Sequence, residues 1–321
     1  MPYQAIAPLT GASAITSWTL EPVTAVCVIV LAVAYLRGVR KVDRWPVART
    51  TLFVGFGLGS WVLMTMWFFG TYDTTLFWVR AVQSVILLMV TPLFLALGMP
   101  LRLLMLAVRP ATAAKLRAFG HGKFAKIITF PAIISIVLLT TPFVLFFTPW
   151  FDVVLRGGVA NYATHLWLVV AGWSYYWTRL QVDPVPRVYF ALVSIGITFA
   201  EVIFDGGLGL LLIFGHDIIG LQHYQAVRDW GPSPKVDQVG GGTAFWIIGD
   251  LSGLPFLGAL FRKMIRDDEK QSVAVDRELD ALEAAARNPA IPKPASGTDE
   301  PAPDDGMQLP WWETDPSRLQ R

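Results

Sequence analysis

Charged residues are scarce in this sequence, and cysteine is almost absent. Only 16% of the 321 residues are Asp, Glu, Lys or Arg, whereas 54% are hydrophobic, and the mean hydropathy is +0.50. Soluble domains carry about 25% charged residues, so this balance excludes an ordinary soluble protein and indicates a membrane protein. The single cysteine, Cys27, excludes an internal disulfide framework and a cysteine-based metal site within one chain.

Signatures of several function classes are also missing. There is no phosphate-binding glycine loop, and no nucleic-acid signature beyond scattered basic residues. A hydrolase needs a nucleophile within reach of a base, but Ser174 and His165 lie nine residues apart on one helix, at different levels. A retinal-type photoreceptor needs a lysine in its last span, and Val239–Phe261 contains none. We therefore expect neither an enzyme nor a nucleic-acid-binding protein.

Seven stretches are apolar and long enough to cross a bilayer core of ~30 Å, which requires about 20 helical residues. Their unbroken hydrophobicity indicates helices, because barrel strands would alternate in polarity. The predicted fold class is all-α, a polytopic membrane protein with a seven-transmembrane-helix bundle. Prolines inside these stretches are read as kinks. The predicted spans are Leu20–Leu36, Thr51–Gly70, Ala81–Met99, Ile127–Trp150, Gly157–Thr178, Val188–Phe214 and Val239–Phe261.

The distribution of Lys and Arg predicts the orientation. The segments that follow the first, third, fifth and seventh stretches hold seventeen basic residues, whereas the opposite loops hold only Arg156, Arg228 and Lys235. Cytoplasmic loops carry the excess of Lys and Arg, so we expect the N-terminus outside and the C-terminus in the cytoplasm.

This orientation divides the chain into four predicted parts. Residues 1–19 form an extracytoplasmic N-terminus and residues 20–263 the membrane domain. Residues 264–287 have apolar positions at helical spacing and predict a cytoplasmic amphipathic helix. The tail, residues 288–321, is rich in Pro, Ala, Asp and Gly, which is typical of disorder. It carries Trp311 and Trp312, which are read either as solvated aromatics or as a docking motif for a partner.

Polar residues within the predicted spans gather toward the outer half of the bilayer. Ionisable side chains are costly in hydrocarbon unless they are paired, so each marks a candidate site. The alternative is a purely structural role, in which these polar residues only connect the helices of the bundle to one another. Three acids against one arginine and one histidine would suit a cation, which keeps a small-cation or proton transporter open as an alternative function. The residues are Arg80, Gln83, Ser84, Asn161, His165, Glu201, Asp205 and Asp250.

Several motifs, taken in order, resemble the CtaG-type cytochrome c oxidase assembly factors, which are bacterial seven-helix membrane proteins. The resemblance covers roughly Phe53 to Glu269. It is carried by Thr91–Pro100, His165 with Ala171-Gly172-Trp173, Asp183–Arg187, Asp237–Gly242, Trp246 with Gly249 and Asp250, and Ile265–Glu269.

The resemblance implies an assembly factor in the bacterial plasma membrane, spanning it several times, whose partners are cytochrome c oxidase subunits or other assembly factors. It also implies a possible role with copper, because the family typically carries outer-half histidines, paired at i, i+4 in the third and fifth spans. Here Arg80 and Ser84 replace the first pair, Asn161 and His165 stand at the second, and Asp205 replaces the histidine of the sixth span.

One His with carboxylates is a poor set of ligands for copper. The metal, if one is held, would need His165 and Asp205 with His216 and His223 from the outer loop. The competing hypothesis is that Arg80 pairs with Asp205 or Glu201 in the space where relatives would hold a metal. In that case His165 is a hydrogen-bonding neighbour, and the protein assists oxidase assembly without binding copper itself.

Overall fold

The computed structural model describes residues 6–120, 130–180 and 191–287. Some helical residues in these ranges, Glu201 and Asp205 among them, are described by their backbone alone. The chain divides into two compact units, Met1–Asp267 and Asp268–Arg321. The predicted disordered tail and its two tryptophans lie outside the described residues, as does the Asp183–Arg187 motif.

All regular structure in the described ranges is helical, as the fold class predicts. The helices are α1 (Gly11–Thr16), α2 (Pro22–Val39), α3 (Val47–Thr50), η1 (Thr51–Leu58), α4 (Gly59–Met66), α5 (Phe68–Tyr72), α6 (Phe77–Val85), η2 (Ile86–Val90), α7 (Thr91–Leu97), α8 (Pro100–Ala107), α9 (Pro110–Gly120), α11 (Pro131–Phe147), α12 (Trp150–Leu155), α13 (Val159–Leu180), α14 (Ala191–Phe214), α15 (Leu221–Val227) and α16 (Pro234–Arg287).

Three helical stretches among the described residues are long and apolar enough to cross a membrane: Pro22–Val39, Val47–Tyr72 and Phe77–Ala107. Two shorter apolar helices follow, Ala132–Phe147 and Val202–Phe214. The chain is thus an all-helical protein suited to a membrane. Each of the seven predicted segments overlaps a described helix, while the number of spans and their orientation stay predictions.

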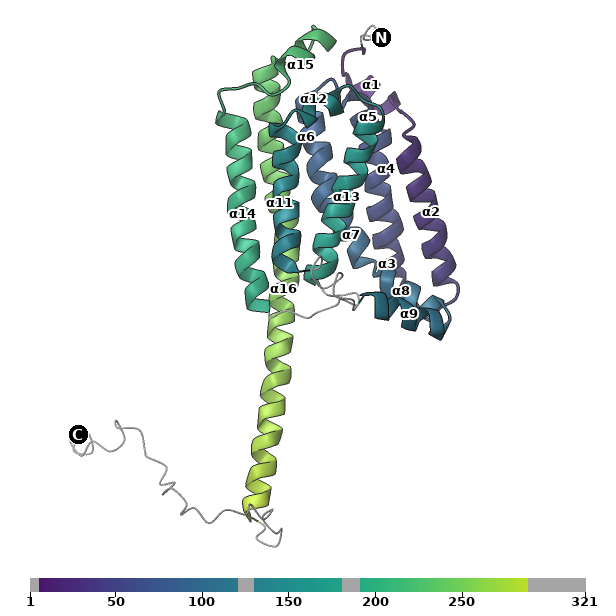
Figure 1. The fold of residues 1–321 in the computed structure, drawn as a ribbon, viewed down its shortest axis with the longest axis vertical. Helices are drawn as coiled ribbons and strands as arrows, with labels where there is room; N and C mark the ends of the chain where they lie inside the picture. Colours follow the sequence, from purple (N-terminus) through teal and green to yellow (C-terminus); the bar gives the residue numbers. More distant parts are fainter. Residues whose placement is uncertain (1–5, 121–129, 181–190, 288–321) are drawn as a thin grey trace, which may run out of the picture. The chain divides into compact units, whose positions relative to one another are not determined.

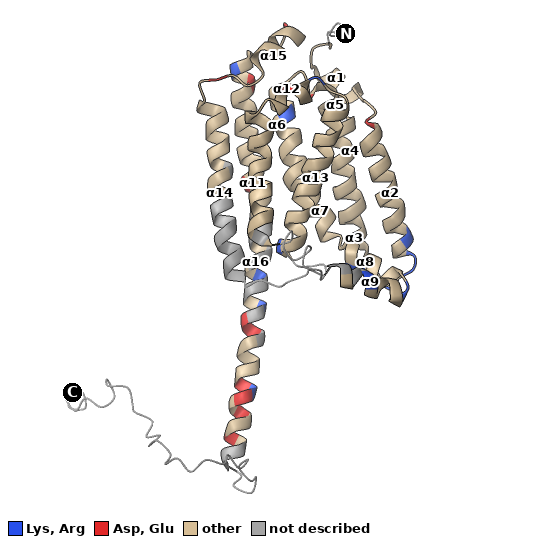
Figure 2. Cartoon of the chain, viewed as in Figure 1, with Lys and Arg blue, Asp and Glu red and all other residues tan. Residues whose placement is uncertain are grey.

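Within the Met1–Asp267 unit the long helices run side by side (Figure 1). The short helices α1, α5, α12 and α15 lie at one end of the bundle, and α3, α8 and α9 lie at the other end. One large apolar core joins most of the helices, including Phe53, Leu88, Phe146, Tyr176 and Phe245. Figure 2 shows most of the described Lys and Arg residues of this unit at the end with α3, α8 and α9.

The third predicted span is not a uniform α-helix. It runs as α6, then a π-helical segment, η2, and then α7, which has Pro92 in its first turn. Pro92 has no N–H to donate to the carbonyl of Leu88 four residues earlier, and the wider turn lies directly before it. Gly172 of α13 packs there, where a Cβ atom would lie 2.0 Å from the Leu88 carbonyl oxygen. The Ala-Gly-Trp motif therefore supplies a close helix approach.

The end of this span is a tight turn. Met99 adopts a left-handed conformation with φ 52° and separates α7 from α8, which begins at Pro100. Tyr35 donates a hydrogen bond of 2.7 Å to the carbonyl of Gly98, and the Tyr35 ring stacks on Phe53 at 4.1 Å. These contacts join α2 and η1 to the turn.

Helix α16 continues without interruption through Arg287. In the second unit its apolar residues Val275, Leu279 and Leu282 are all exposed. An amphipathic role for this segment therefore stays a prediction.

A buried ionic cluster as the candidate functional site

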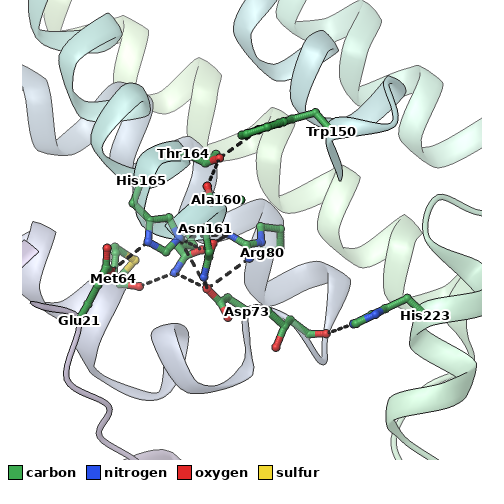
Figure 3. Close-up of polar contacts among 12 residues, drawn as sticks. Glu21, Met64, Asp73, Arg80, Trp150, Ala160, Asn161, Thr164, His165 and His223 are labelled. Atoms are coloured by element: carbon green, nitrogen blue, oxygen red, sulfur yellow. Dashed lines mark hydrogen bonds and ion pairs between the residues drawn. The ribbon is translucent and has the colours of Figure 1, made fainter. Parts of the chain in front are cut away.

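Polar side chains from four parts of the bundle meet in one buried cluster (Figure 3). Six residues supply them. Glu21 lies at the start of α2, and Asp73 directly follows α5. Two further residues lie on α6, Arg80 and Gln83, and two on α13, Asn161 and His165. All are at most 7% exposed. We call the following residues the ionic cluster: Glu21, Asp73, Arg80, Gln83, Asn161 and His165.

Arg80 lies at the centre of the ionic cluster and is fully buried. Its Nη2 atom lies 3.3 Å from the Asp73 carboxylate. Its Nη1 atom donates to the side-chain oxygens of Gln83, at 3.0 Å, and Asn161, at 2.8 Å. Asn161 in turn donates to Asp73 at 2.9 Å. The guanidinium is thus held by a carboxylate and two amide oxygens, as a buried charge requires.

His165 uses both ring nitrogens within the ionic cluster. Its Nδ1 atom lies 3.0 Å from the Glu21 carboxylate. Its Nε2 atom lies 3.0 Å from the Gln83 side-chain oxygen and 3.1 Å from Nη1 of Arg80. Asp73 lies 3.6 Å from the same nitrogen. His165 therefore connects the start of α2 to α6 and α13.

The ionic cluster brings together four ionisable side chains. These are the carboxyl groups of Glu21 and Asp73, the guanidinium of Arg80 and the imidazole of His165. One Glu21 oxygen, Oε1, has no hydrogen-bond partner among the described residues, nor does Nε of Arg80. A buried ion pair that loses one member leaves an uncompensated charge, which makes the four ionisable groups interdependent.

Four of the predicted site residues meet here, namely Arg80, Gln83, Asn161 and His165. Ser84 is buried on α6, and its hydroxyl has no hydrogen-bond partner in the described part of the chain. Asp250 lies on α16, where its Oδ1 atom has none either among these residues. The side chains of Glu201 and Asp205 lie outside the described residues, so their pairing with Arg80 stays a prediction.

Glu21 and Asp73 are cluster members that the sequence interpretation assigned to no site. Both lie at helix ends, Glu21 before Pro22 and Asp73 in the turn before α6. Acids at such positions ordinarily face water at the bilayer surface. The available signal was charge balance, because Arg80 needs a nearby carboxylate and Asp73 is the acid closest to it in the sequence.

The ionic cluster as described does not fit a copper ion. It offers one imidazole, whose two nitrogens are already occupied, and the guanidinium of Arg80 lies beside it and would repel a metal cation. His223 contacts the Thr74 carbonyl at 2.8 Å, and His216 is exposed beside Phe214. Among the described residues no group of three or more His, Cys, Asp or Glu could hold a metal ion.

A second buried ion pair lies at the beginning of α6. Asp237, in the first turn of α16, accepts hydrogen bonds from the backbone N–H groups of Phe77 and Trp78 at 3.0 and 2.9 Å. Its carboxylate also pairs with Arg228 at 2.7 Å. Burial raises the pKa of Asp237, whereas these three donors lower it. The carboxylate caps α6, which is favourable at a helix N-terminus.

The neighbouring residues of the same motif fix the remaining contacts of α16. Gln238 accepts a hydrogen bond from the backbone of Ile219 at 2.8 Å and donates to the Leu212 carbonyl at 3.0 Å. At Gly241 and Gly242 an added Cβ would lie 2.7 Å from Phe77 and Leu212, respectively. The Asp-Gln-Val-Gly-Gly-Gly motif therefore joins α16 to α6 and α14.

Comparison with known proteins agrees with these motifs. A family model described as cytochrome c oxidase caa3 assembly factor (Caa3_CtaG) matches residues 33–267. An uncharacterized protein of Mycobacterium leprae is 27% identical over 281 residues, which is 84% of this chain and 42% of the relative.

A similar relative is an uncharacterized protein of Mycobacterium bovis, which is 26% identical over 291 residues, or 87% of this chain and 44% of that protein. The chain therefore spans less than half the length of these relatives. No solved structure matches. Because the family model covers most of the chain, this protein belongs to the cytochrome c oxidase caa3 assembly factor family.

Proposed function

We propose that this protein is a membrane assembly factor that acts on a cytochrome c oxidase subunit, or on another assembly factor, without carrying copper itself. Family membership supports the assembly role. The proposal that the protein carries no copper rests on the position of Arg80, whose guanidinium lies against His165 and Asp73. At this position and at Ser84 the family typically presents histidines.

The proposed arrangement is a seven-span protein of the bacterial plasma membrane with its N-terminus outside. The concentration of Lys and Arg at the end with α3, α8 and α9 supports this orientation (Figure 2). The ionic cluster then lies toward the outer face, because its residues come from near the beginnings of α2, α6 and α13 and from the turn after α5. Helix α5 lies at the same end of the bundle as α1, α12 and α15 (Figure 1).

In this proposal the ionic cluster replaces a metal as the connection between helices. Glu21, Asp73, Arg80 and His165 come from four separate places in the chain, and each contacts at least one of the others. Such a network holds the first, third and fifth predicted spans in one register. The client would then bind to a surface of preformed shape, and binding to such a surface costs less ordering entropy.

The test is deletion of the gene, followed by complementation with defined variants. We expect oxidase activity and the copper content of the oxidase to fall on deletion and to return with the wild-type gene. The purified wild-type protein should contain far less than one copper per chain by elemental analysis. A second variant, Arg80→His with Ser84→His, restores the family pair of histidines, and we expect it to gain copper.

The outcomes separate the two halves of the proposal. Unchanged oxidase activity after deletion would overturn the assembly role, as would proton or cation flux through the purified protein in vesicles. Stoichiometric copper in the wild-type protein, lost in His165→Asn, His216→Asn or His223→Asn, would overturn only the claim that it carries no metal. Arg156→Met, which changes an exposed arginine at the same end of the bundle, is the matched control.

A further inference from the structure

An apolar groove of about 790 Å³ lies in the Met1–Asp267 unit, among α2, η1, α4, α8 and α13. This volume is within the range of ~300–1,000 Å³ that is usual for small-molecule sites. Its lining is almost entirely apolar, and Trp61 and Trp173 are among the lining residues. Val26 and Val30, which also line it, are 62% and 58% exposed. The groove therefore opens on the side of the bundle that would face the lipid.

The groove follows α2 for most of its length. Its lining residues on this side begin at Val26 and end at Lys41. The helical part, from Val26 to Val39, is thirteen steps of ~1.5 Å and spans roughly 20 Å, which is about two thirds of a bilayer core of ~30 Å. An elongated apolar ligand, such as an acyl chain, fits these dimensions.

Two cations lie at one end of the groove. Arg37 lies in the last turn of α2 and Lys41 lies two residues after the end of that helix, and both are exposed groove residues. Neither forms a side-chain hydrogen bond or an ion pair with the part of the chain that the structure describes. Basic residues are found at this end of α2 and around α8 in Figure 2. Two uncompensated cations beside an apolar groove are complementary to an anionic head group with an acyl chain.

Close packing gives the groove a fixed wall at this end. A Cβ atom on Gly38 would lie 3.1 Å from Leu103 of α8, so the two helices touch between the two cations. Tyr35, one turn earlier, is held by its hydrogen bond to the turn at Gly98. Arg37 thus projects from a closely packed turn of α2, and Lys41 follows directly after it.

We propose that this groove binds one anionic phospholipid, with an acyl chain along α2 and the phosphate held by Arg37 and Lys41. Each basic residue near a membrane surface contributes about 1 kcal/mol toward anionic lipid, which corresponds to roughly fivefold in affinity. The site is independent of the proposed assembly role, because it uses no residue of the ionic cluster.

The experiment uses the full chain in phosphatidylcholine vesicles that contain equal mole fractions of dibrominated phosphatidylglycerol or dibrominated phosphatidylcholine. Bromine quenches nearby tryptophan, and the signal of Trp61 and Trp173 is isolated by subtracting the Trp61→Phe/Trp173→Phe variant. We expect the wild type to bind phosphatidylglycerol at least fivefold more strongly than phosphatidylcholine. Arg37→Gln/Lys41→Gln should lose this preference. Arg40→Gln/Arg44→Gln is the matched control, because it removes two nearby charges that do not line the groove.

A second measurement needs no charge variant. Cys27 lines the groove and is the only cysteine, so the rate at which a maleimide labels it reports occupancy. Added phosphatidylglycerol should slow this labelling severalfold more than added phosphatidylcholine. Equal quenching and equal protection by the two lipids would mean ordinary lipid contact only and would overturn the proposal. Loss of the preference in the Arg40→Gln/Arg44→Gln control would overturn the assignment to Arg37 and Lys41.

Discussion

Asp73 lies 3.3 Å from the guanidinium of Arg80, and the two side chains are 3% and 0% exposed. The two residues are separated by the start of α6 and face each other within the bundle. A carboxylate brought this close makes a buried arginine tolerable in a membrane protein. Each of the two buried charges therefore depends on the other.

Removing one member of this pair should destabilise the protein more than removing both. Arg80→Met or Asp73→Leu alone strands a buried charge, at a cost of about 3–5 kcal/mol. The double variant Arg80→Met/Asp73→Leu should recover much of that loss. The measurement is a double-mutant cycle read by unfolding in detergent, with Arg156→Met as an exposed control that stays within about 0.5 kcal/mol.

A parallel cycle replaces Asp73→Leu with Asp205→Leu. Coupling with Asp73 and additivity with Asp205 would identify Asp73 as the partner of Arg80. Strong coupling with Asp205 instead would favour the ion pair expected from the sequence. Additive effects in both cycles would mean that neither carboxylate stabilises the arginine.

The cap on α6 gives a second prediction. Asp237→Ala removes the acceptor of two backbone N–H groups and the carboxylate that pairs with Arg228, so we expect a loss of about 3–5 kcal/mol. Asp237→Asn keeps one acceptor oxygen and should cost less. Asp229→Asn makes the same chemical change at an exposed nearby residue and should leave the unfolding midpoint almost unchanged. An equal effect of the two Asn variants would contradict the capping role.

The contact between Gly172 and the Leu88 carbonyl leads to a third prediction. Gly172→Ala places a Cβ atom against a backbone oxygen that cannot rotate away, so α13 must move from η2. We expect a loss of more than about 1 kcal/mol. Gly207→Ala is the control, since nothing lies within 4 Å of its added Cβ, and an alanine in a helix should stabilise by up to about 1 kcal/mol. Both variants would be compared by thermal unfolding in detergent.

The fourth prediction concerns pH. Burial lowers the pKa of His223 below its usual 6.5, although the Thr74 carbonyl opposes this shift. The folded protein therefore binds fewer protons than the unfolded chain in this window. The stability that this residue contributes is present above pH 6.5 and is lost as the pH falls through the lowered pKa.

The apparent melting temperature should fall between pH 7.5 and pH 5 in the wild type and fall less in His223→Gln, which keeps a donor for Thr74 but does not titrate. His216→Gln changes an exposed histidine of the same loop and should keep the wild-type slope. If His223→Gln retains the full pH dependence, the titrating group lies elsewhere.

The helices were predictable from the sequence because the apolar segments are long and unbroken. Their ends and internal irregularities were less so. The π-helical segment η2 depends on Pro92 together with the partner surface at Gly172, and no local pattern encodes that partner. The motifs identified the family from the sequence. Their structural roles, a helix cap at Asp237 and a close helix approach at Gly172, became visible only in the folded structure.

The candidate site was half predicted. Arg80 and His165 stood out because charged or titratable groups in apolar segments are costly. Glu21 and Asp73 did not, since acids at the ends of spans are common, and only the fold shows that the chain turns them inward. Sequence distance also misleads here, because Glu21 meets His165 from 144 residues away.

The cap of α6 also sets an order of events during biosynthesis. Phe77 and Asp237 are 160 residues apart in the chain. At a synthesis rate of ~5–20 residues per second, Asp237 is synthesised roughly 8–32 s after Phe77. During this time the N–H groups of Phe77 and Trp78 lack the carboxylate that accepts their hydrogen bonds in the folded protein. Over that interval the earlier helices are inserted with an open end, and water or lipid head groups must satisfy it. A chain that stops before Asp237 would have the helix α6 but not the carboxylate that caps its first turn.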